Sequence, residues 1–429
     1  MFKSIDGRQL AVIRILFGLL SLIQLLGFYR YDILFYSNQG WLPVDKALQM
    51  GPSPQWSLLT VISNPFAVDI FFMALFVAAV FMTIGFCTRW SVLAVLVGLI
   101  SLTARNWLGD SGEDKIPVAM CFYLFFSSCG SAWSVDSFIR RYKKRLSEIQ
   151  VSYFAAMDKQ EEPETTLCPA WTLVFIQLQV CLIYLNSGLD KLHGMEWING
   201  TAILTALSDR VFSRWDVEWL RNYPFYISAM TLMTKITLLW ELLFTFLVLN
   251  RRTRWIALGL GVLIHGGIVF LMNVHLFGQM MIASYAAFLP NDLFVKIEKW
   301  IKNRWRAPSS KRAVALFDFE CSAYVKWALL LSMVDWTRRV EWVPLQDEAR
   351  WRKRLPDLNV SQSREIFHFV TPNGAVLQGA EGIEQLLYSI PSIRPLCVFL
   401  VLPGVSALLN WAVSHGRQID KYLHEFFTS

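Results

Sequence analysis

Charged residues are scarce in this 429-residue chain, where Asp, Glu, Lys and Arg occupy only 17% of positions. Soluble proteins carry about 25%. Apolar residues make up 55% of the chain, and the mean hydropathy is +0.40. This composition excludes intrinsic disorder, collagen-like sequence and a coiled coil. Most of the chain is therefore expected to lie within a membrane.

Paired cysteines are also lacking, because none of the seven cysteines forms a Cys-x-x-Cys motif. Most of them lie in or beside apolar stretches, where a buried thiol behaves as a small hydrophobic group. A disulfide framework and a zinc site are not expected, and we predict no metal. No nucleic-acid-binding motif accompanies the net charge of +7, so no nucleic-acid partner is predicted.

Long apolar stretches, in contrast, are abundant. A membrane-spanning helix needs about 20 mostly apolar residues, and eight stretches reach or approach that length. The first lacks a small-x-small cleavage site and is interpreted as a retained anchor. The third, fourth and eighth are short enough to be partly buried in protein. The eight stretches are 10–29, 66–86, 91–104, 116–133, 169–188, 225–249, 254–272 and 276–290.

Lysine and arginine fall mainly on one side of these spans. The N-terminus and every second connection between spans, together with residues 291–312, hold nineteen lysines and arginines, including the clusters at 140–145 and 251–254. The connections on the opposite side hold eight. Cytoplasmic connections carry such an excess. The pattern predicts a multi-pass protein of about eight helices with both termini in the cytoplasm, occupying residues 1–290.

The remainder of the chain differs in composition. Residues 291–312 form a basic, tryptophan-containing linker, expected to be an amphipathic helix on an anionic leaflet. Residues 313–429 then read as a soluble α/β domain, with strands at 313–317 and 340–344 separated by a helix over 322–333. A hairpin around Asn373-Gly374 and a helix over 380–389 follow. This order is expected of a thioredoxin-like domain.

Specific residues of this domain resemble the DCC family of thiol-disulfide oxidoreductase-like domains. Asp318 and Cys321 match the first two members of the family motif Asp-x-x-Cys-x-x-Cys, whereas Tyr324 occupies the position of the second cysteine. Dithiol exchange needs a second thiol beside the first. Two interpretations stay open, namely a structural domain and a single reactive thiol at a helix N-terminus, where the pKa of a thiol falls.

Ionisable residues inside spans are costly and usually face a partner or a cavity. Five occur here: Arg14, Asp69, Lys235, Glu241 and His265. Lys235 and Glu241 are six residues apart, so they do not share a helix face. Ion pairs between helices and headgroup contacts are alternatives for each residue, but five such residues together favour a polar interior.

Polar motifs also gather at the ends of the spans opposite the basic clusters. They lie at 105–110, 184–202 and 272–277. A partly desolvated lysine such as Lys191 can serve as a base there. The alternative is a lysine that extends to phosphate headgroups.

Several spaced residues of these motifs resemble the HTTM (horizontally transferred transmembrane) domain, which is shared with vitamin K-dependent gamma-glutamyl carboxylase. The resemblance runs over 5–290 and rests on Tyr184, Ser187-Gly188, Lys191-Leu192, Trp197 and Gly200, followed by His265, Met272-Asn273, Leu276-Phe277 and Tyr285. It implies a pocket for a quinol or vitamin K-like isoprenoid quinone, with Lys191 as the base of gamma-carboxylase-like chemistry. The large domain that binds the substrate propeptide in the animal carboxylases is absent.

These observations predict catalytic roles for Lys191 and His265, with Cys321 as the reactive residue of a second hypothesis. Membrane lipid and a peptide or protein at the exterior face are the expected partners, and the fusion of HTTM with DCC implies a bacterial cytoplasmic membrane. A thiol redox protein and a non-enzymatic module that binds lipid or a partner are the alternatives. The residues expected to bind the cofactor are Asn106, Asp110, Asn273, His275, Arg14, Glu241 and Trp197.

Overall fold

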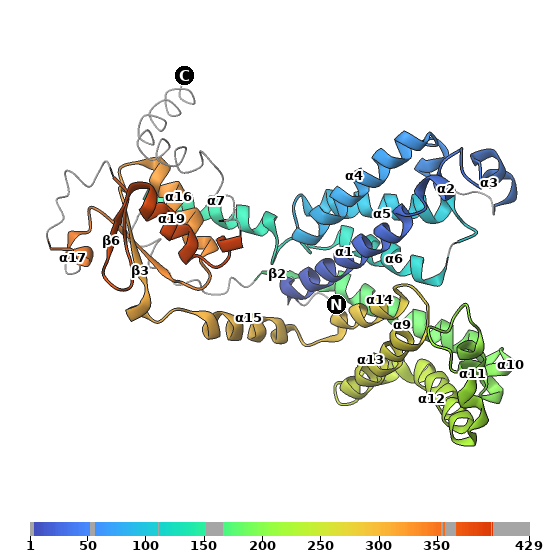
Figure 1. Ribbon diagram of the computed structural model, residues 1–429. Coiled ribbons are helices and arrows are strands. Elements are labelled where there is room, and N and C mark those ends of the chain that lie inside the picture. Colours follow the sequence, from blue (N-terminus) through green and yellow to red (C-terminus); the bar gives the residue numbers. More distant parts are fainter. Residues whose placement is uncertain are drawn as a thin grey trace. The chain divides into compact units, whose positions relative to one another are not determined.

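The computed structural model describes residues 4–51, 56–109, 111–151, 166–352, 355–356, 366–395 and 397. The chain divides into two compact units (Figure 1). We call the first, formed by Met1–Phe138 and Pro163–Phe294, the membrane unit. The second, formed by Ile139–Glu162 and Val295–Ser429, is the C-terminal unit.

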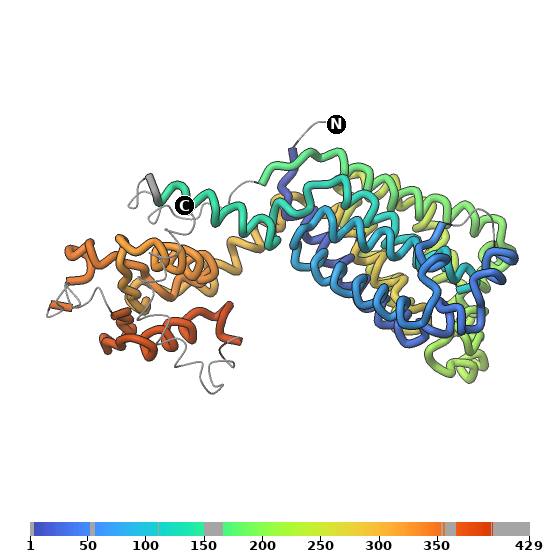
Figure 2. Tube along the Cα trace, turned by 90° about the horizontal axis from the view of Figure 1, so that it is seen from above, coloured from blue at the N-terminus to red at the C-terminus, as the bar shows by residue number. Residues whose placement is uncertain are grey.

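Six helices among the described residues are long and apolar enough to cross a membrane, so the chain is a multi-pass membrane protein. The six are α1 (Gly7–Tyr29), α4 (Pro65–Ile84), α5 (Thr88–Arg105), α9 (Trp171–Leu192), α12 (Pro224–Leu249) and α13 (Arg254–Leu271). In the membrane unit, α4 lies beside α1 and α5, and α12 lies beside α9 and α13 (Figure 2).

The other two expected spans form shorter elements. A capping box at Ser111 begins α6 (Gly112–Phe126), and the stretch 276–290 divides into α14 (Phe277–Ser284) and the 3₁₀ helix η3 (Tyr285–Phe288). Met120 in α6 and all four residues of η3 are buried. Protein covers much of these two elements, which explains why they are shorter than the bilayer is thick.

Shorter elements complete the membrane unit. A two-stranded antiparallel sheet joins β1 (Ser4–Asp6) to β2 (Leu167–Pro169). The connections between spans hold α2 (Asp32–Tyr36), α3 (Val44–Met50), η1 (Leu58–Thr60), α10 (Met195–Asn199), α11 (Ala202–Ser208) and η2 (Glu218–Asn222). Exposed tryptophans lie near helix ends, as at the two membrane interfaces of known proteins; they include Trp90, Trp215, Trp219 and Trp255.

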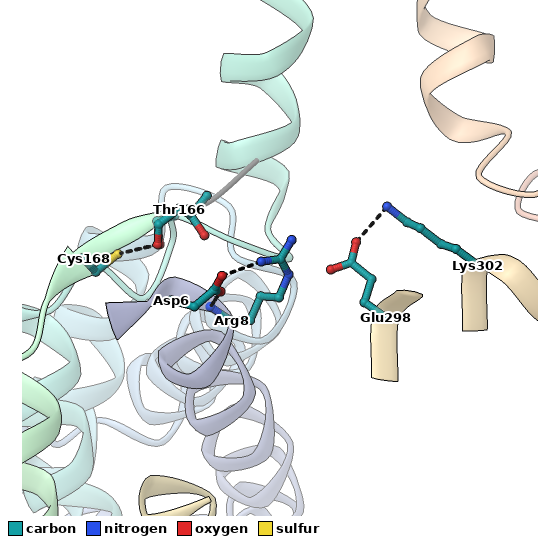
Figure 3. A network of polar contacts seen from close by, with 7 residues as sticks. Asp6, Arg8, Thr166, Cys168, Glu298 and Lys302 are labelled. Atoms are coloured by element: carbon teal, nitrogen blue, oxygen red, sulfur yellow. Dashed lines mark hydrogen bonds and ion pairs between the residues drawn. The ribbon is translucent and has the colours of Figure 1, made fainter. Parts of the chain in front are cut away.

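One end of the membrane unit, which we call the basic end, contains β1, β2 and the turns before α5 and after α6. Asp136 accepts hydrogen bonds from the backbone amides of Cys87 and Thr88 at 2.9 and 2.8 Å. Asp6 caps α1 and accepts from Arg8 Nη1 at 2.6 Å (Figure 3). These contacts satisfy backbone groups that a helix end would otherwise leave unpaired.

The C-terminal unit contains a four-stranded mixed sheet in the order β4-β3-β5-β6. Strands β3 (Ala313–Phe317) and β4 (Val340–Pro344) are parallel and are connected through α16 (Ser322–Val334). Strands β5 (His368–Val370) and β6 (Val376–Gln378) form the hairpin expected at Asn373-Gly374, where Gly374 has a φ of +88°. This is the predicted order of elements for 313–389.

The remaining helices of the described chain are shorter or amphipathic. Helix α7 (Val135–Val151) begins in the membrane unit and continues into the C-terminal unit. Helix α15 (Asn291–Trp305) likewise begins in the membrane unit and continues into the C-terminal unit. The C-terminal unit also contains η4 (Ser309–Lys311), α17 (Glu348–Trp351) and α19 (Gly379–Ser389). The last residues expected in this domain, from 398 onward, lie outside the described part of the chain.

Candidate functional site

Lys191 forms an ion pair inside the membrane unit. Its Nζ lies 2.7 Å from Oε2 and 3.0 Å from Oε1 of Glu241, and it donates a hydrogen bond to Ser187 Oγ at 2.5 Å. The side chain of Lys191 is 20% exposed and that of Glu241 is 10% exposed. Lys191 lies in the last turn of α9, and its contact with Ser187, one turn earlier, directs the ammonium back along the helix. The ammonium is therefore held by a carboxylate on the neighbouring span.

A close approach of α9 and α12 makes this pair possible. A Cβ atom on Gly188 would lie 3.0 Å from a side-chain carbon of Leu242 and 3.2 Å from its backbone nitrogen. Further along the same helices, Thr245 donates to the Cys181 carbonyl at 3.2 Å. Glycine at 188 thus lets the backbones approach. Lys235, which the sequence placed near Glu241, is exposed, and the partner of Glu241 is on another helix.

A second polar network is buried beside this pair. The Tyr184 hydroxyl lies 2.7 Å from Nε2 of His265 and 2.6 Å from the Tyr285 hydroxyl. All three residues are buried, and His265 is only 2% exposed. A Cβ on Gly261 would lie 2.3 Å from the Tyr285 hydroxyl oxygen, so glycine provides the space for this network.

The two networks share α9, because Tyr184 and Lys191 are seven residues apart and so face the same side of the helix. Glu241 also lies close enough to Tyr184 and Tyr285 for its charge to act on both hydroxyls. Lys191 is likewise close enough for its charge to act on His265. Nδ1 of His265 has no hydrogen-bond partner in the described part of the chain. The two networks together form a buried polar centre, in which one ring nitrogen of His265 lacks a hydrogen-bond partner among the described residues.

Aromatic rings surround this centre. The Lys191 ammonium lies 4.9 Å from the centroid of the Trp197 ring, a cation–π contact. The His265 ring is 6.1 Å from the ring of Trp240 and 5.5 Å from that of Phe277. The structure thus brings together four residues selected from the sequence, namely Trp197, Lys191, Glu241 and His265, and a largely apolar wall surrounds the polar groups.

The other predicted cofactor-binding residues lie elsewhere. Arg14 donates to the carbonyls of Cys129 and Trp133 at the basic end. Asn106 follows α5 and hydrogen-bonds to Tyr36. The backbone amide of Asn273 donates to the Phe212 carbonyl at 2.7 Å, and the residue is exposed. Asp110 lies outside the described residues.

His275 contacts the centre only through its neighbours. Its Nδ1 lies 3.2 Å from Oε1 of Glu113, and Oε2 of Glu113 accepts from the backbone amide of Phe277 at 3.2 Å. Burial raises the pKa of the Glu113 carboxyl, an effect that His275 opposes. Because the Phe277 ring contacts His265, Glu113 and His275 hold the segment that packs on the centre.

Cys321 belongs to the C-terminal unit, where it occupies the N-cap position of α16 and is buried. Its backbone amide donates to the Asp318 carbonyl at 3.3 Å, and Asp318 Oδ1 accepts from Gln346 Nε2 at 2.6 Å. None of the seven cysteines is in a disulfide. In the described residues, no cluster of three or more His, Cys, Asp or Glu is placed to hold a metal.

Two family models match parts of the chain. Residues 145–293, which contain Lys191, Glu241 and His265, match a known membrane domain. The matching family model is the HTTM domain. The match covers α9, α12 and α13 and confirms the HTTM resemblance, while the DCC1-like thiol-disulfide oxidoreductase model matches residues 315–418, confirming the second resemblance.

Among curated proteins, the sporulation-delaying protein SdpB of Bacillus subtilis (strain 168) is 32% identical over 143 residues. The alignment covers 33% of this chain and 43% of SdpB, so less than half of that relative is spanned. No solved structure matches the chain.

Sequence reasoning did not select Tyr184, Tyr285 or Ser187 as site residues, although all three occur in the HTTM motifs. A usable signal existed for two of them, because Tyr184, Ser187 and Lys191 recur at the i, i+3, i+7 spacing of one helix face. For Tyr285 there was no local signal, since η3 reaches the centre only through the tertiary fold.

Proposed function

We propose that the HTTM-containing membrane unit binds a quinol-type isoprenoid lipid, that Lys191 is its base, and that the resulting chemistry modifies a peptide or small substrate. The observation that carries this proposal is the Lys191–Glu241 pair beside a buried histidine on membrane-spanning helices. Ionisable residues buried within spans usually serve function.

The residues present suit such a lipid. His265 Nδ1 is buried and unsatisfied in the described part of the chain, so it has capacity for one hydrogen bond to a ligand hydroxyl. The rings of Trp197, Trp240 and Phe277 offer apolar surface. A quinol, when bound, would supply an acidic hydroxyl and reducing equivalents.

The chain's own groups can prepare the base. Transfer of one proton from Lys191 Nζ to Glu241 Oε2, over 2.7 Å, leaves a neutral amine and a neutral carboxylic acid. Charge separation is costly in an apolar environment, so removing both charges together is less unfavourable than removing one. The neutral Nζ can then accept a proton from a bound hydroxyl, with Ser187 Oγ holding the amine in place.

The location belongs to the same proposal. We place the protein in a bacterial cytoplasmic membrane because it joins HTTM and DCC1-like regions in one chain. We place both termini in the cytoplasm because nineteen basic residues share one side of the spans. The Lys191 end of α9 then faces the exterior, where a peptide substrate would have access. The relative SdpB is a sporulation-delaying protein by name. For this chain, a role in peptide maturation is part of the proposal.

Mass spectrometry of copurifying lipids tests the proposal. The full chain purified in mild detergent is expected to carry an isoprenoid quinone, and the double variant Lys191→Met/Glu241→Gln is expected to lose at least about tenfold of it. The double variant leaves no unpaired buried charge and so preserves the fold. Lys235→Met, which changes an exposed lysine of α12, is the matched control and should retain the quinone.

Two results would contradict this function. A wild-type protein free of quinone, even after addition of menaquinol to the purified protein, would refute lipid binding. Equal quinone content in wild type and double variant would refute the role of the Lys191–Glu241 pair.

A second candidate function rests on the DCC1-like match and on the position of Cys321 at the start of α16. In this function the Cys321 thiolate attacks an external disulfide, forms a mixed disulfide with one half and releases the other half as a thiol. The exchange ends at that mixed disulfide within this domain because Tyr324 replaces the second motif cysteine. Alkylation of the native protein tests it. Cys321 should react faster than buried Cys121, and an equal, slow rate at both thiols would end this hypothesis.

A further inference from the structure

Helix α15 presents an apolar stripe that is exposed in the described part of the chain. Ile297, Trp300, Ile301 and Trp305 are 41, 67, 37 and 59% exposed, respectively. Their spacing of three, four and eight residues from Ile297 places them along one face of the helix. We call this set the α15 stripe. Two exposed tryptophans on one short helix are costly in water, so the stripe is expected to have a partner.

The rest of α15 and the loop after it are basic. Lys296 lies one turn before Trp300 and so flanks the stripe, whereas Lys299 lies on the opposite side of the helix. Lys302 forms an ion pair with Glu298 at 2.7 Å (Figure 3). Residues 291–312 hold seven lysines and arginines against two acidic residues. The segment therefore carries a net charge of +5 beside an apolar face.

Hydrogen bonds also fix the position of the segment just before α15. Gln9, in the first turns of α1, donates through Nε2 to the carbonyls of Ala286, Ala287 and Leu289 at 2.9–3.0 Å. These contacts fix the end of η3 at the basic end of the bundle. Helix α15 begins at Asn291, two residues after Leu289, so its first turn starts at that membrane edge.

We propose that α15 lies in the plane of the membrane at the basic end, with the α15 stripe inserted at the interface and the lysines bound to anionic phospholipid headgroups. Tryptophan is enriched at this depth of a bilayer, and each basic residue near an anionic surface contributes about 1 kcal/mol. Lysine is depleted at protein–protein interfaces, which argues for lipid over a protein partner.

Hydrogen exchange of the full chain in nanodiscs tests this binding site. Peptides from α15 are expected to exchange at least about tenfold more slowly in discs with about 30% phosphatidylglycerol than in pure phosphatidylcholine. Raising the salt from about 50 to about 500 mM should remove most of that difference, because headgroup attraction is screened. Exchange in β3 and β4 should stay constant and report that the C-terminal unit remains folded.

Two variants separate the contribution of the tryptophans from that of the lysines. Trp300→Ala should lose most of the protection in α15, whereas Trp327→Ala, which removes another exposed tryptophan from α16, should not. Lys296→Gln/Lys299→Gln should abolish the preference for phosphatidylglycerol.

Three outcomes would overturn the proposal. They are equal protection in both lipid compositions, protection that persists in detergent without lipid and so indicates a protein partner, and fast exchange of α15 in every disc.

Discussion

At the scale of single residues, the membrane unit depends on one ion pair that the sequence could not assign. Lys191 and Glu241 were both conspicuous as charges in or beside spans, and His265 as a histidine within one. Their partners were not evident, because residues 50 positions apart meet only when α9 packs on α12. Along the sequence, Lys235 is the charged residue of α12 nearest to Glu241, but a spacing of six residues places the two on different faces of the helix.

Lys191→Met should destabilise the membrane unit by about 3–5 kcal/mol, because it leaves the Glu241 carboxylate buried without its partner. Adding Glu241→Gln should recover most of that loss. Reversible unfolding in mixed micelles gives the free energies for the wild type, both single variants and the double variant. Additive losses in the double variant would show that the two side chains do not interact.

At the scale of elements, glycines decide how closely the helices of the site approach. A Cβ at Gly188 or Gly261 would meet atoms of a neighbouring element, whereas one at Gly259 would meet nothing within 4 Å. The sequence did not distinguish these glycines. Helix periodicity locates a glycine on a face, but the distance to the opposite backbone depends on packing.

Gly261→Ala should destabilise the protein by about 1–3 kcal/mol, because its Cβ would displace the Tyr285 hydroxyl and the Trp240 ring. Gly259→Ala, two residues earlier on α13, should be neutral or stabilise by up to about 1 kcal/mol, since alanine is the better helix former. The same unfolding assay measures both. Equal effects of the two substitutions would contradict the packing of Tyr285 against α13.

At the scale of the whole molecule, the two units have different sources of stability. The membrane unit satisfies polar groups internally, as Gln9 does for the end of η3. The C-terminal unit has a sheet core of ordinary apolar residues, with β3 buried along its full length. In the C-terminal unit, burial lowers the pKa of His368 in β5, so the stability of this unit is expected to depend on pH near neutrality.

The C-terminal unit should lose stability as the pH falls below about 6.5, the ordinary pKa of histidine. His368 in β5 stays neutral in the folded state while its unfolded form takes up a proton, so acid favours unfolding until the pH passes the lowered folded-state pKa. Hydrogen exchange of β3 amides between pH 7 and 5, corrected for intrinsic rates, measures this. In His368→Gln the slope should flatten, and an unchanged slope would assign the effect to another group.

The sequence by itself determined the membrane character, the C-terminal α/β domain and both family resemblances, because apolar length, strand order and spaced motifs are local properties. It also singled out Lys191, Glu241, His265 and Trp197. Only the tertiary structure paired Lys191 with Glu241, brought Tyr285 to Tyr184 and His265, and placed Arg14 at the basic end. It also reduced the expected spans to six long helices and two covered elements. The physical reason is that pairing and burial depend on distances between helices, which no periodicity along one helix contains.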